Sequence, residues 1–156
     1  MGIDNGCRET RSMAGEFTLP IEAGKVREFA KAVFDDDNPI YWDAEYARSK
    51  GLKAPIAPPT FVQASSFWRP EDPAAPKRDM RLVLHGEQEF DYLRPIYVGD
   101  VMTVSTAQVD QDQKTGRRGG TMTFTVNETT YTNQDGQPCV KVRSTTIETS
   151  QEVRDS

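Results

Sequence analysis

The sequence contains a single histidine, His85, and only two cysteines, Cys7 and Cys139, which lie far apart. One imidazole excludes sites built from several histidines, and two isolated cysteines lack the close spacing of zinc ligands. We therefore expect no metal, and because no nucleotide or flavin signature is present we expect no cofactor. Both cysteines are interpreted as free thiols in a reducing, cytoplasmic compartment.

Long apolar runs and an excess of positive charge are also missing. No apolar stretch approaches the roughly 20 residues of a membrane-spanning helix, and the N-terminal segment lacks the apolar core of a signal peptide. The formal net charge is −5 at pH 7, whereas binding to nucleic acid depends on a basic surface. These absences predict that neither a membrane nor a nucleic acid is a partner.

The chain has 156 residues, a length that suits one domain. We interpret the polar residues 1–15 as a disordered lead-in, residues 16–150 as the domain and residues 151–156 as a tail. Apolar residues make up only 36% of the chain. This modest fraction indicates a sheet with one face in water, or a subunit that completes its core against a partner.

The first half of the chain is predicted to be mainly helical. After a short strand at residues 16–19, apolar residues recur every three or four positions over residues 22–34, as in an amphipathic helix. They are Val26, Phe29, Ala30, Val33 and Phe34. The acidic run at residues 35–37 and the following Asn38-Pro39 end this helix, because a residue before proline avoids the helical region.

Two further helices are expected before the strands begin. Asp43 is placed to cap a short helix at residues 44–50, which Gly51 closes. A third helix begins at Pro58-Pro59, because proline suits the first helical turn, where its missing N–H would have no partner. Its apolar side chains lie around most of its circumference, as in a buried helix: Phe61, Val62, Ala64, Phe67 and Trp68.

From Leu82 onward, after an exposed loop at residues 69–79, the pattern has the period of two that is typical of strands. Strands are predicted at residues 87–92, 100–110, 121–131 and 138–149, with turns at residues 112–120 and 133–136. Helices followed by antiparallel strands indicate the α+β class. We expect a long antiparallel sheet wrapped around one central buried helix.

Several segments, in order, carry a resemblance to a known family: residues 34–43, 57–61, 84–92, 94–95, 98–100, 121–124 and 131–136. Over residues 16–149 the chain resembles the MaoC-like hydratase/dehydratase family, in particular its N-terminal, dehydratase-like half. The resemblance implies a single hot-dog domain that lies beside a second such fold, in a homodimer or in a heterodimer with a MaoC-like subunit. It also implies a role in fatty acid metabolism, with an acyl thioester of coenzyme A or acyl carrier protein as ligand.

The resemblance further implies candidate catalytic residues. Family members carry a Gly-Asp-x-Asn-Pro-x-His pattern, and here Asp36 falls at the acid position while Tyr41 replaces the histidine. Tyrosine, with an ordinary pKa of about 10, is a poor base at neutral pH, although its hydroxyl donates hydrogen bonds. Asp35 stands in place of the glycine. Alternatively, residues 35–37 form a solvated acidic turn without a role in catalysis.

The start of the third helix differs from the family as well. Family members tend to carry His-Gly where this chain has Pro58-Pro59, and proline has no N–H. Fewer donors at this position predict weaker polarisation of a thioester by this chain. By the resemblance, the candidate substrate-binding residues are Asn38, Pro59, Thr60 and Phe61.

The remaining candidate functional residues each have two possible interpretations. His85 is the one imidazole available as a base, or alternatively a structural residue where a strand starts beside Gly86. Lys114, Arg117 and Arg118 either contact coenzyme A phosphates or an acidic carrier protein, or form a solvated hairpin tip.

Three functions are compatible with these observations. The first is a subunit of an (R)-specific hydroxyacyl-thioester dehydratase or enoyl-thioester hydratase that shapes the acyl pocket, while a MaoC-like partner supplies the Asp/His pair. The second is a self-sufficient homodimeric enzyme that uses Asp36, Tyr41 and His85. The third is a non-catalytic module that binds acyl thioesters.

Overall fold

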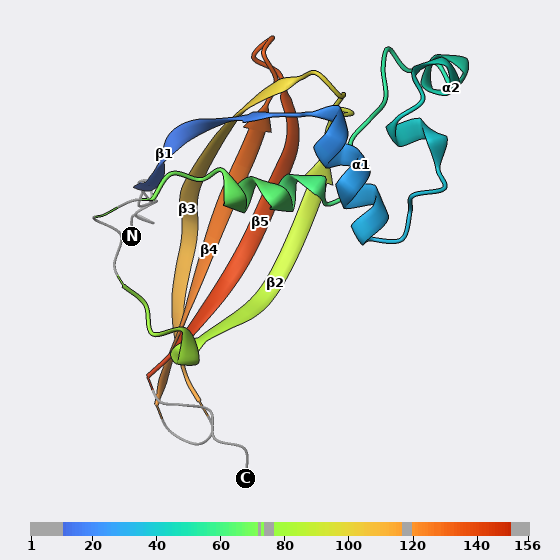
Figure 1. Ribbon diagram of the computed structural model, residues 1–156. Helices are drawn as coiled ribbons and strands as arrows, with labels where there is room; N and C mark the ends of the chain where they lie inside the picture. Colours follow the sequence, from blue (N-terminus) through green and yellow to red (C-terminus); the bar gives the residue numbers. More distant parts are fainter. Residues whose placement is uncertain (1–10, 72, 74–76, 117–119, 151–156) are drawn as a thin grey trace, which may run out of the picture.

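The computed structural model describes residues 11–71, 73, 77–116 and 120–150 (Figure 1). After a first strand, the described helices precede the other four strands. The elements are β1 (Arg11–Pro20), α1 (Ala23–Ala32), η1 (Pro39–Tyr41), α2 (Ala44–Ser49), η2 (Phe61–Phe67), η3 (Met80–Leu82), β2 (Val83–Tyr92), β3 (Val101–Thr115), β4 (Thr121–Thr132) and β5 (Pro138–Thr149). The labels α and η mark α-helices and 3₁₀ helices. The predicted α+β class is confirmed.

The five strands form one antiparallel sheet in the order β1-β3-β4-β5-β2. The three strands at the centre follow one another in the chain, whereas the two edge strands come from before and after the helices. The sheet is curved, and η2 crosses it in front of β3, β4 and β5 (Figure 1). The helix α1 packs against η2, and the core forms between these two helices and the sheet.

The attachment of η2 to the sheet is both apolar and polar. Phe61 and Val62 are almost fully buried, and the Phe61 ring meets Phe29 of α1 edge to face, with ring centroids 5.4 Å apart. The buried Tyr131 of β4 donates its hydroxyl proton to the Val62 carbonyl, 3.1 Å away. Its oxygen lies 2.9 Å from the Ser65 hydroxyl, which therefore donates to it. A buried tyrosine hydroxyl thus has both partners that it needs.

The third helix differs from the prediction of a helix buried on all sides. It is a seven-residue 3₁₀ helix, and Phe67 is 87% exposed. Phe61 and Phe67 are six residues apart and fall on the same side of a helix with three residues per turn. Phe61 is covered by α1, whereas Phe67 lies two turns further along, where the described part of α1 does not cover it.

Other boundaries shift in ways that local structure explains. The first helix ends at Ala32, and Phe34 follows with a left-handed backbone (φ 60°) and a side chain that is 93% exposed, so it is not a core residue. The first strand begins at Arg11 rather than at Glu16. The third strand continues to Thr115 instead of turning at Asp112.

Locally encoded features were predicted correctly. The Asp43 carboxylate accepts hydrogen bonds from two N–H groups at the start of α2, and Gly51 takes a positive φ of 81° after that helix. In the turn at residues 133–136, the Asn133 side chain accepts from the N–H groups of Asp135 and Gln137. The last strand has the predicted bounds.

We expect Tyr131→Phe to lower the free energy of unfolding by about 1–3 kcal/mol, because the Ser65 hydroxyl and the Val62 carbonyl lose their buried partner. Urea denaturation followed by circular dichroism measures this change. The control is Tyr46→Phe, whose hydroxyl makes no hydrogen bond with the described residues and whose removal should cost less than about 0.5 kcal/mol. Equal stability of both variants would contradict the assignment.

Candidate functional site

The acidic loop after α1 is closed by one short hydrogen bond. The Asn38 side chain accepts from the Ile40 N–H at 3.3 Å and so begins η1. This turn brings Tyr41, which is only 5% exposed, back toward the end of α1. There the Tyr41 hydroxyl donates to Asp35 Oδ2 at 2.6 Å. The loop is therefore a structural unit in which a tyrosine and an aspartate are paired.

This pairing holds Tyr41 in its neutral form. Burial, followed by the hydrogen bond to Asp35 and the charge of that carboxylate, raises the pKa of Tyr41 to about 12, although the Asn38 side chain acts in the opposite direction. A phenol with this pKa keeps its proton at neutral pH. Tyr41 is consequently unable to replace the family's histidine as a general base.

The predicted acid, Asp36, is not part of this pair. Its side chain is exposed and makes no hydrogen bond or ion pair with the described residues. The partner of Tyr41 is instead Asp35, which the sequence pattern identified only as a departure from glycine. The sequence feature that could have predicted this pairing is an acidic residue six positions before Tyr41, on the other side of the Asn38-Pro39 turn.

His85 lies elsewhere in the fold. It is an exposed residue near the start of β2, opposite Thr146 in β5 and next to a bulge at Gly86. A Cβ atom on Gly86 would come within 3.1 Å of the Ile147 side chain and of the Thr145 carbonyl, which explains the glycine. His85 precedes Tyr92 by seven strand residues, a span of roughly 20 Å. The structure does not bring His85 to the loop that holds Tyr41.

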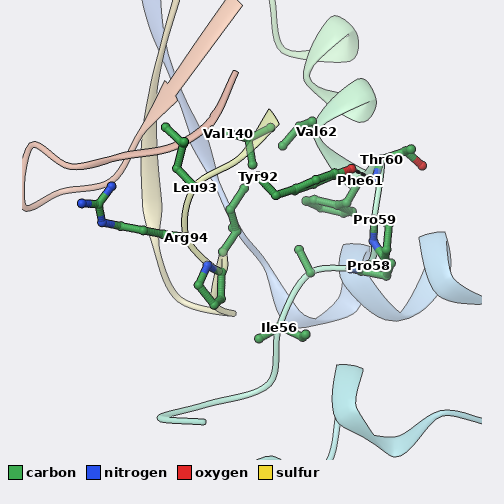
Figure 2. Close-up of a pocket in the computed structure, with 13 residues that line it drawn as sticks. Ile56, Pro58, Pro59, Thr60, Phe61, Val62, Tyr92, Leu93, Arg94 and Val140 are labelled. Carbon is green, nitrogen blue, oxygen red and sulfur yellow. Dashed lines mark hydrogen bonds between the residues drawn. The ribbon is translucent and has the colours of Figure 1, made fainter. Parts of the chain in front are cut away.

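A pocket opens where η2 begins and β2 ends (Figure 2). Its volume is about 350 Å³, within the usual range for small-molecule sites. The lining residues come from three segments of the chain: Ile56, Ala57, Pro58, Pro59, Thr60, Phe61, Val62, Tyr92, Leu93, Arg94, Pro95, Ile96 and Val140. Most of them are apolar, so the pocket suits an alkyl chain.

Main-chain contacts hold the two sides of this pocket together. The N–H of Ala57 donates to the Ile96 carbonyl at 2.8 Å, and Ile56 forms an isolated bridge with Tyr97. The N–H of Thr60 donates to the Tyr92 hydroxyl at 3.0 Å. Thr60 itself adopts a left-handed conformation, with φ at 64°, and this turns the chain from the two prolines into η2.

The pocket contains part of the predicted substrate-binding set and none of the predicted catalytic set. Pro59, Thr60 and Phe61 line it, whereas Asn38 does not. The lining residues include neither a carboxylate nor an imidazole, and their one charged side chain is that of Arg94. The pocket is therefore an apolar cavity without a carboxylate or an imidazole to act as acid or base.

The lining residues from β2 and β5 were missed by sequence reasoning. Tyr92, Leu93 and Val140 lie far from residues 56–62 in the chain. Tyr92 pairs with Val140 where β2 meets β5, and Leu93, just after β2, donates its N–H to the Cys139 carbonyl. One sequence feature pointed to Tyr92: it falls on the same face of its strand as Phe90. In the structure the two rings stack, with centroids 6.0 Å apart.

The basic residues have local roles. The Arg94 guanidinium donates to the Pro138 carbonyl at 2.7 Å rather than pairing with an acid. Lys114 lies 4.0 Å from Asp112 and over the Phe124 ring, and Arg117 and Arg118 lie outside the described residues.

Cys139 is a free thiol whose pKa is raised by burial and by the charge of Asp100, and Cys7 lies outside the described residues. In the part of the chain that the structure describes, no group of three or more His, Cys, Asp or Glu side chains is placed to hold a metal ion. Within the same residues, no helix has the length and apolar character needed to cross a membrane.

The sequence of this chain is similar to one protein family and to several proteins of the UPF0336 group. The family model described as "FAS1-like, dehydratase domain region" matches residues 10–142. A UPF0336 protein of Saccharopolyspora erythraea is 37% identical over 127 residues, which is 79% of this chain and 77% of the relative. A UPF0336 protein of Streptomyces coelicolor is 46% identical over 95 residues, or 57% of this chain. The chain spans 62% of the length of this Streptomyces relative.

Solved structures share the fold. The HadBC complex of Mycobacterium tuberculosis, a (3R)-hydroxyacyl-ACP dehydratase, matches with a TM-score of 0.64 at 23% identity, over 88% of this chain and 96% of that chain. The ChsH1–ChsH2 complex of the same organism has a TM-score of 0.70 at 18% identity (91% and 85%). The (R)-hydratase of A. caviae has a TM-score of 0.65 at 18% identity (86% and 93%). The expected hot-dog fold and the resemblance to MaoC-like proteins are confirmed.

The pairing of Tyr41 with Asp35 predicts a specific effect of alkaline pH. Because the pKa of Tyr41 in the folded chain, about 12, lies above its value of about 10 in an unfolded chain, the resulting stabilisation is complete below about pH 10 and is lost as the pH rises toward 12. We expect the stability difference between wild type and Tyr41→Phe to shrink over that interval. Urea denaturation at a series of pH values measures it, with Tyr46→Phe as control. A constant difference would refute the pairing.

Proposed function

The chain belongs to the FAS1-like dehydratase domain family, and on this premise we propose that it is one subunit of a two-subunit hydroxyacyl-thioester dehydratase or enoyl-thioester hydratase. In this proposal the chain holds the acyl group of a coenzyme A or carrier-protein thioester in the pocket at the start of η2. A MaoC-like partner supplies the aspartate and the histidine that transfer protons. The reaction is the reversible, (R)-specific exchange of water between a 3-hydroxyacyl and an enoyl thioester.

One observation carries the proposal: none of the residues of the acid–base loop, residues 35–41, lines the pocket, although Ile56 of the pocket donates its N–H to the Ile40 carbonyl of that loop. The pocket is apolar and has neither a carboxylate nor an imidazole among its lining residues. The loop that carries the acid and base in the resembling family holds a tyrosine with a pKa of about 12. Adding or removing water requires a base and an acid at adjacent carbons, so a chain of this kind needs a partner to complete the reaction.

The energetics of the pocket suit an acyl chain. Each methylene group moved from water into apolar surroundings contributes about 0.8 kcal/mol to binding. The buried Phe61, Val62 and Val140 form the inner wall, and they are anchored by η2 and β5 and therefore stay in place when the pocket is empty. A preformed apolar wall lets this burial contribute to affinity with little ordering cost.

The free edge of β2 supports pairing with another subunit. Among the described strands, β2 pairs only with β5, so the N–H and C=O groups of its other edge have no strand partner. An exposed edge of ten residues is a surface on which a second sheet can continue. Leu84 and Leu93, near the two ends of this strand, are 44% and 43% exposed. Two of the structural neighbours, HadBC and ChsH1–ChsH2, are themselves complexes.

A second function is supported by the same pocket. Without an acid or a base of its own, the pocket would equally serve a non-catalytic module that binds acyl thioesters. The self-sufficient homodimer is less well supported, because Asp36, Tyr41 and His85 are not brought together within one chain. Activity with a partner distinguishes the dehydratase subunit from the binding module.

We expect the purified chain alone to hydrate crotonyl-CoA at least about a hundredfold more slowly than its complex with a MaoC-like partner that carries Gly-Asp-x-Asn-Pro-x-His, because a general base contributes at least that factor. Loss of the enoyl-thioester absorbance measures the rate. The control is a complex in which the partner's histidine is replaced by alanine, which should return the rate to that of the chain alone. Rapid turnover by the isolated chain would overturn the subunit model.

We expect Ala57→Leu to fill part of the pocket and weaken the binding of long-chain acyl-CoA by about tenfold, since overpacking costs about 1–3 kcal/mol. Short-chain acyl-CoA should be less affected, because it leaves the filled part vacant. Calorimetric titration across chain lengths measures both. The matched control is Ala32→Leu, at the exposed last residue of α1. Equal affinities of wild type and Ala57→Leu for every chain length would place the acyl group elsewhere.

A further inference from the structure

The pocket has few hydrogen-bond donors left for a ligand. Pro58, Pro59 and Pro95 have no N–H at all. Six other lining residues already donate their N–H groups within the protein: Ile56, Ala57, Thr60, Phe61, Leu93 and Arg94. A thioester carbonyl placed here must therefore find its donor mainly among side chains, and the lining offers three: Thr60, Tyr92 and Arg94.

Two of these three side chains point away from the pocket. Figure 2 shows the Arg94 side chain extending away from η2, and its guanidinium donates to the Pro138 carbonyl. The Thr60 hydroxyl points away from the other lining side chains in the same view. Tyr92 differs, because its ring extends from the end of β2 toward Thr60 and Phe61 and so spans the two sides of the pocket (Figure 2).

The hydrogen bond that Tyr92 makes leaves its own proton unused. The Thr60 N–H can only donate, so in the 3.0 Å contact the Tyr92 oxygen is the acceptor. The Tyr92 proton has no acceptor among the described residues. A phenol oxygen that accepts a hydrogen bond becomes a better donor through its own O–H, because neighbouring hydrogen bonds polarise one another. Stacking on Phe90 holds the ring in this position.

We propose that the Tyr92 hydroxyl donates a hydrogen bond to the carbonyl oxygen of the bound acyl thioester. Tyr92 then provides the donor that a chain with Pro58-Pro59 at this turn does not offer through its backbone. It orients the thioester with its alkyl chain along Phe61 and Val62, and it stabilises the negative charge that grows on the carbonyl oxygen when the α-carbon loses its proton. No proton is transferred from Tyr92 in this role.

This inference rests on the proposed acyl-thioester pocket, and its test separates the two. Tyr92→Phe removes the hydroxyl and keeps the ring that stacks on Phe90. Wild type and variant are each titrated with an acyl-CoA and with the S-alkyl-CoA of the same chain length, a thioether that lacks only the carbonyl oxygen. The quantity of interest is the ratio of the two affinities.

We expect Tyr92→Phe to lower the affinity for the thioester by about threefold to tenfold, the effect of one hydrogen bond, and to leave the affinity for the thioether unchanged. A residue with a purely packing role would not change the ratio. The matched control is Tyr97→Phe, because Tyr97 lies close by in the chain but does not line the pocket and its hydroxyl makes no hydrogen bond with the described residues.

The other outcomes each decide the question. An unchanged ratio in Tyr92→Phe, or an equal loss for both ligands, overturns the role of Tyr92 while the acyl pocket stands. Failure of the wild-type chain to bind either ligand overturns the acyl pocket and, with it, the assignment of Tyr92.

Discussion

The buried hydroxyl of Tyr131 is the contact on which the arrangement of this molecule depends. It joins the middle of the sheet to both Val62 and Ser65 of η2. In this buried region, a polar group without a hydrogen-bond partner would lower the free energy of unfolding about as much as a cavity in the core would. Together with the burial of Phe61 and Val62, this polar attachment fixes the position of η2 on the sheet. Once η2 is fixed, its first residues must lie beside the end of β2, and the pocket forms there.

Two departures from the resembling family's pattern shape the loop after α1 and the turn before η2. Tyr41 fills the position of a base, and Asp35 at the preceding glycine position gives its hydroxyl an acceptor. The pair ties the loop together and keeps the Tyr41 hydroxyl protonated at neutral pH, because the pKa of Tyr41 is raised to about 12. At the other site, two prolines leave the turn without N–H donors, and the Tyr92 hydroxyl lies against the next N–H along the chain.

The two faces of the sheet explain the modest apolar content. The face under η2 carries Val104, Val142 and Tyr131, which are buried. The opposite face carries Glu128, which pairs with Lys141 and Arg143 on the neighbouring strand. These largely exposed pairs add little stability individually, but they keep that face polar.

The sequence by itself determined the features that depend on neighbours in the chain. Alternation along residues 138–149, the Asp43 cap and the Asn133 turn are set by side chains within a few residues of the backbone they organise, and each was predicted correctly. The α+β class followed from the same local patterns, and the family resemblance singled out Pro59, Thr60 and Phe61, which line the pocket.

Only the tertiary structure decided which residues meet across the fold. It paired Tyr41 with Asp35 instead of Asp36, left Phe67 in solvent, kept His85 far from the pocket and brought Tyr92 to Thr60. Each of these outcomes depends on how η2, α1 and β2 pack, because burial and hydrogen-bond partners are set by residues distant in the chain. A periodic pattern shows that a side chain is apolar, but whether it is covered depends on the element that packs against it.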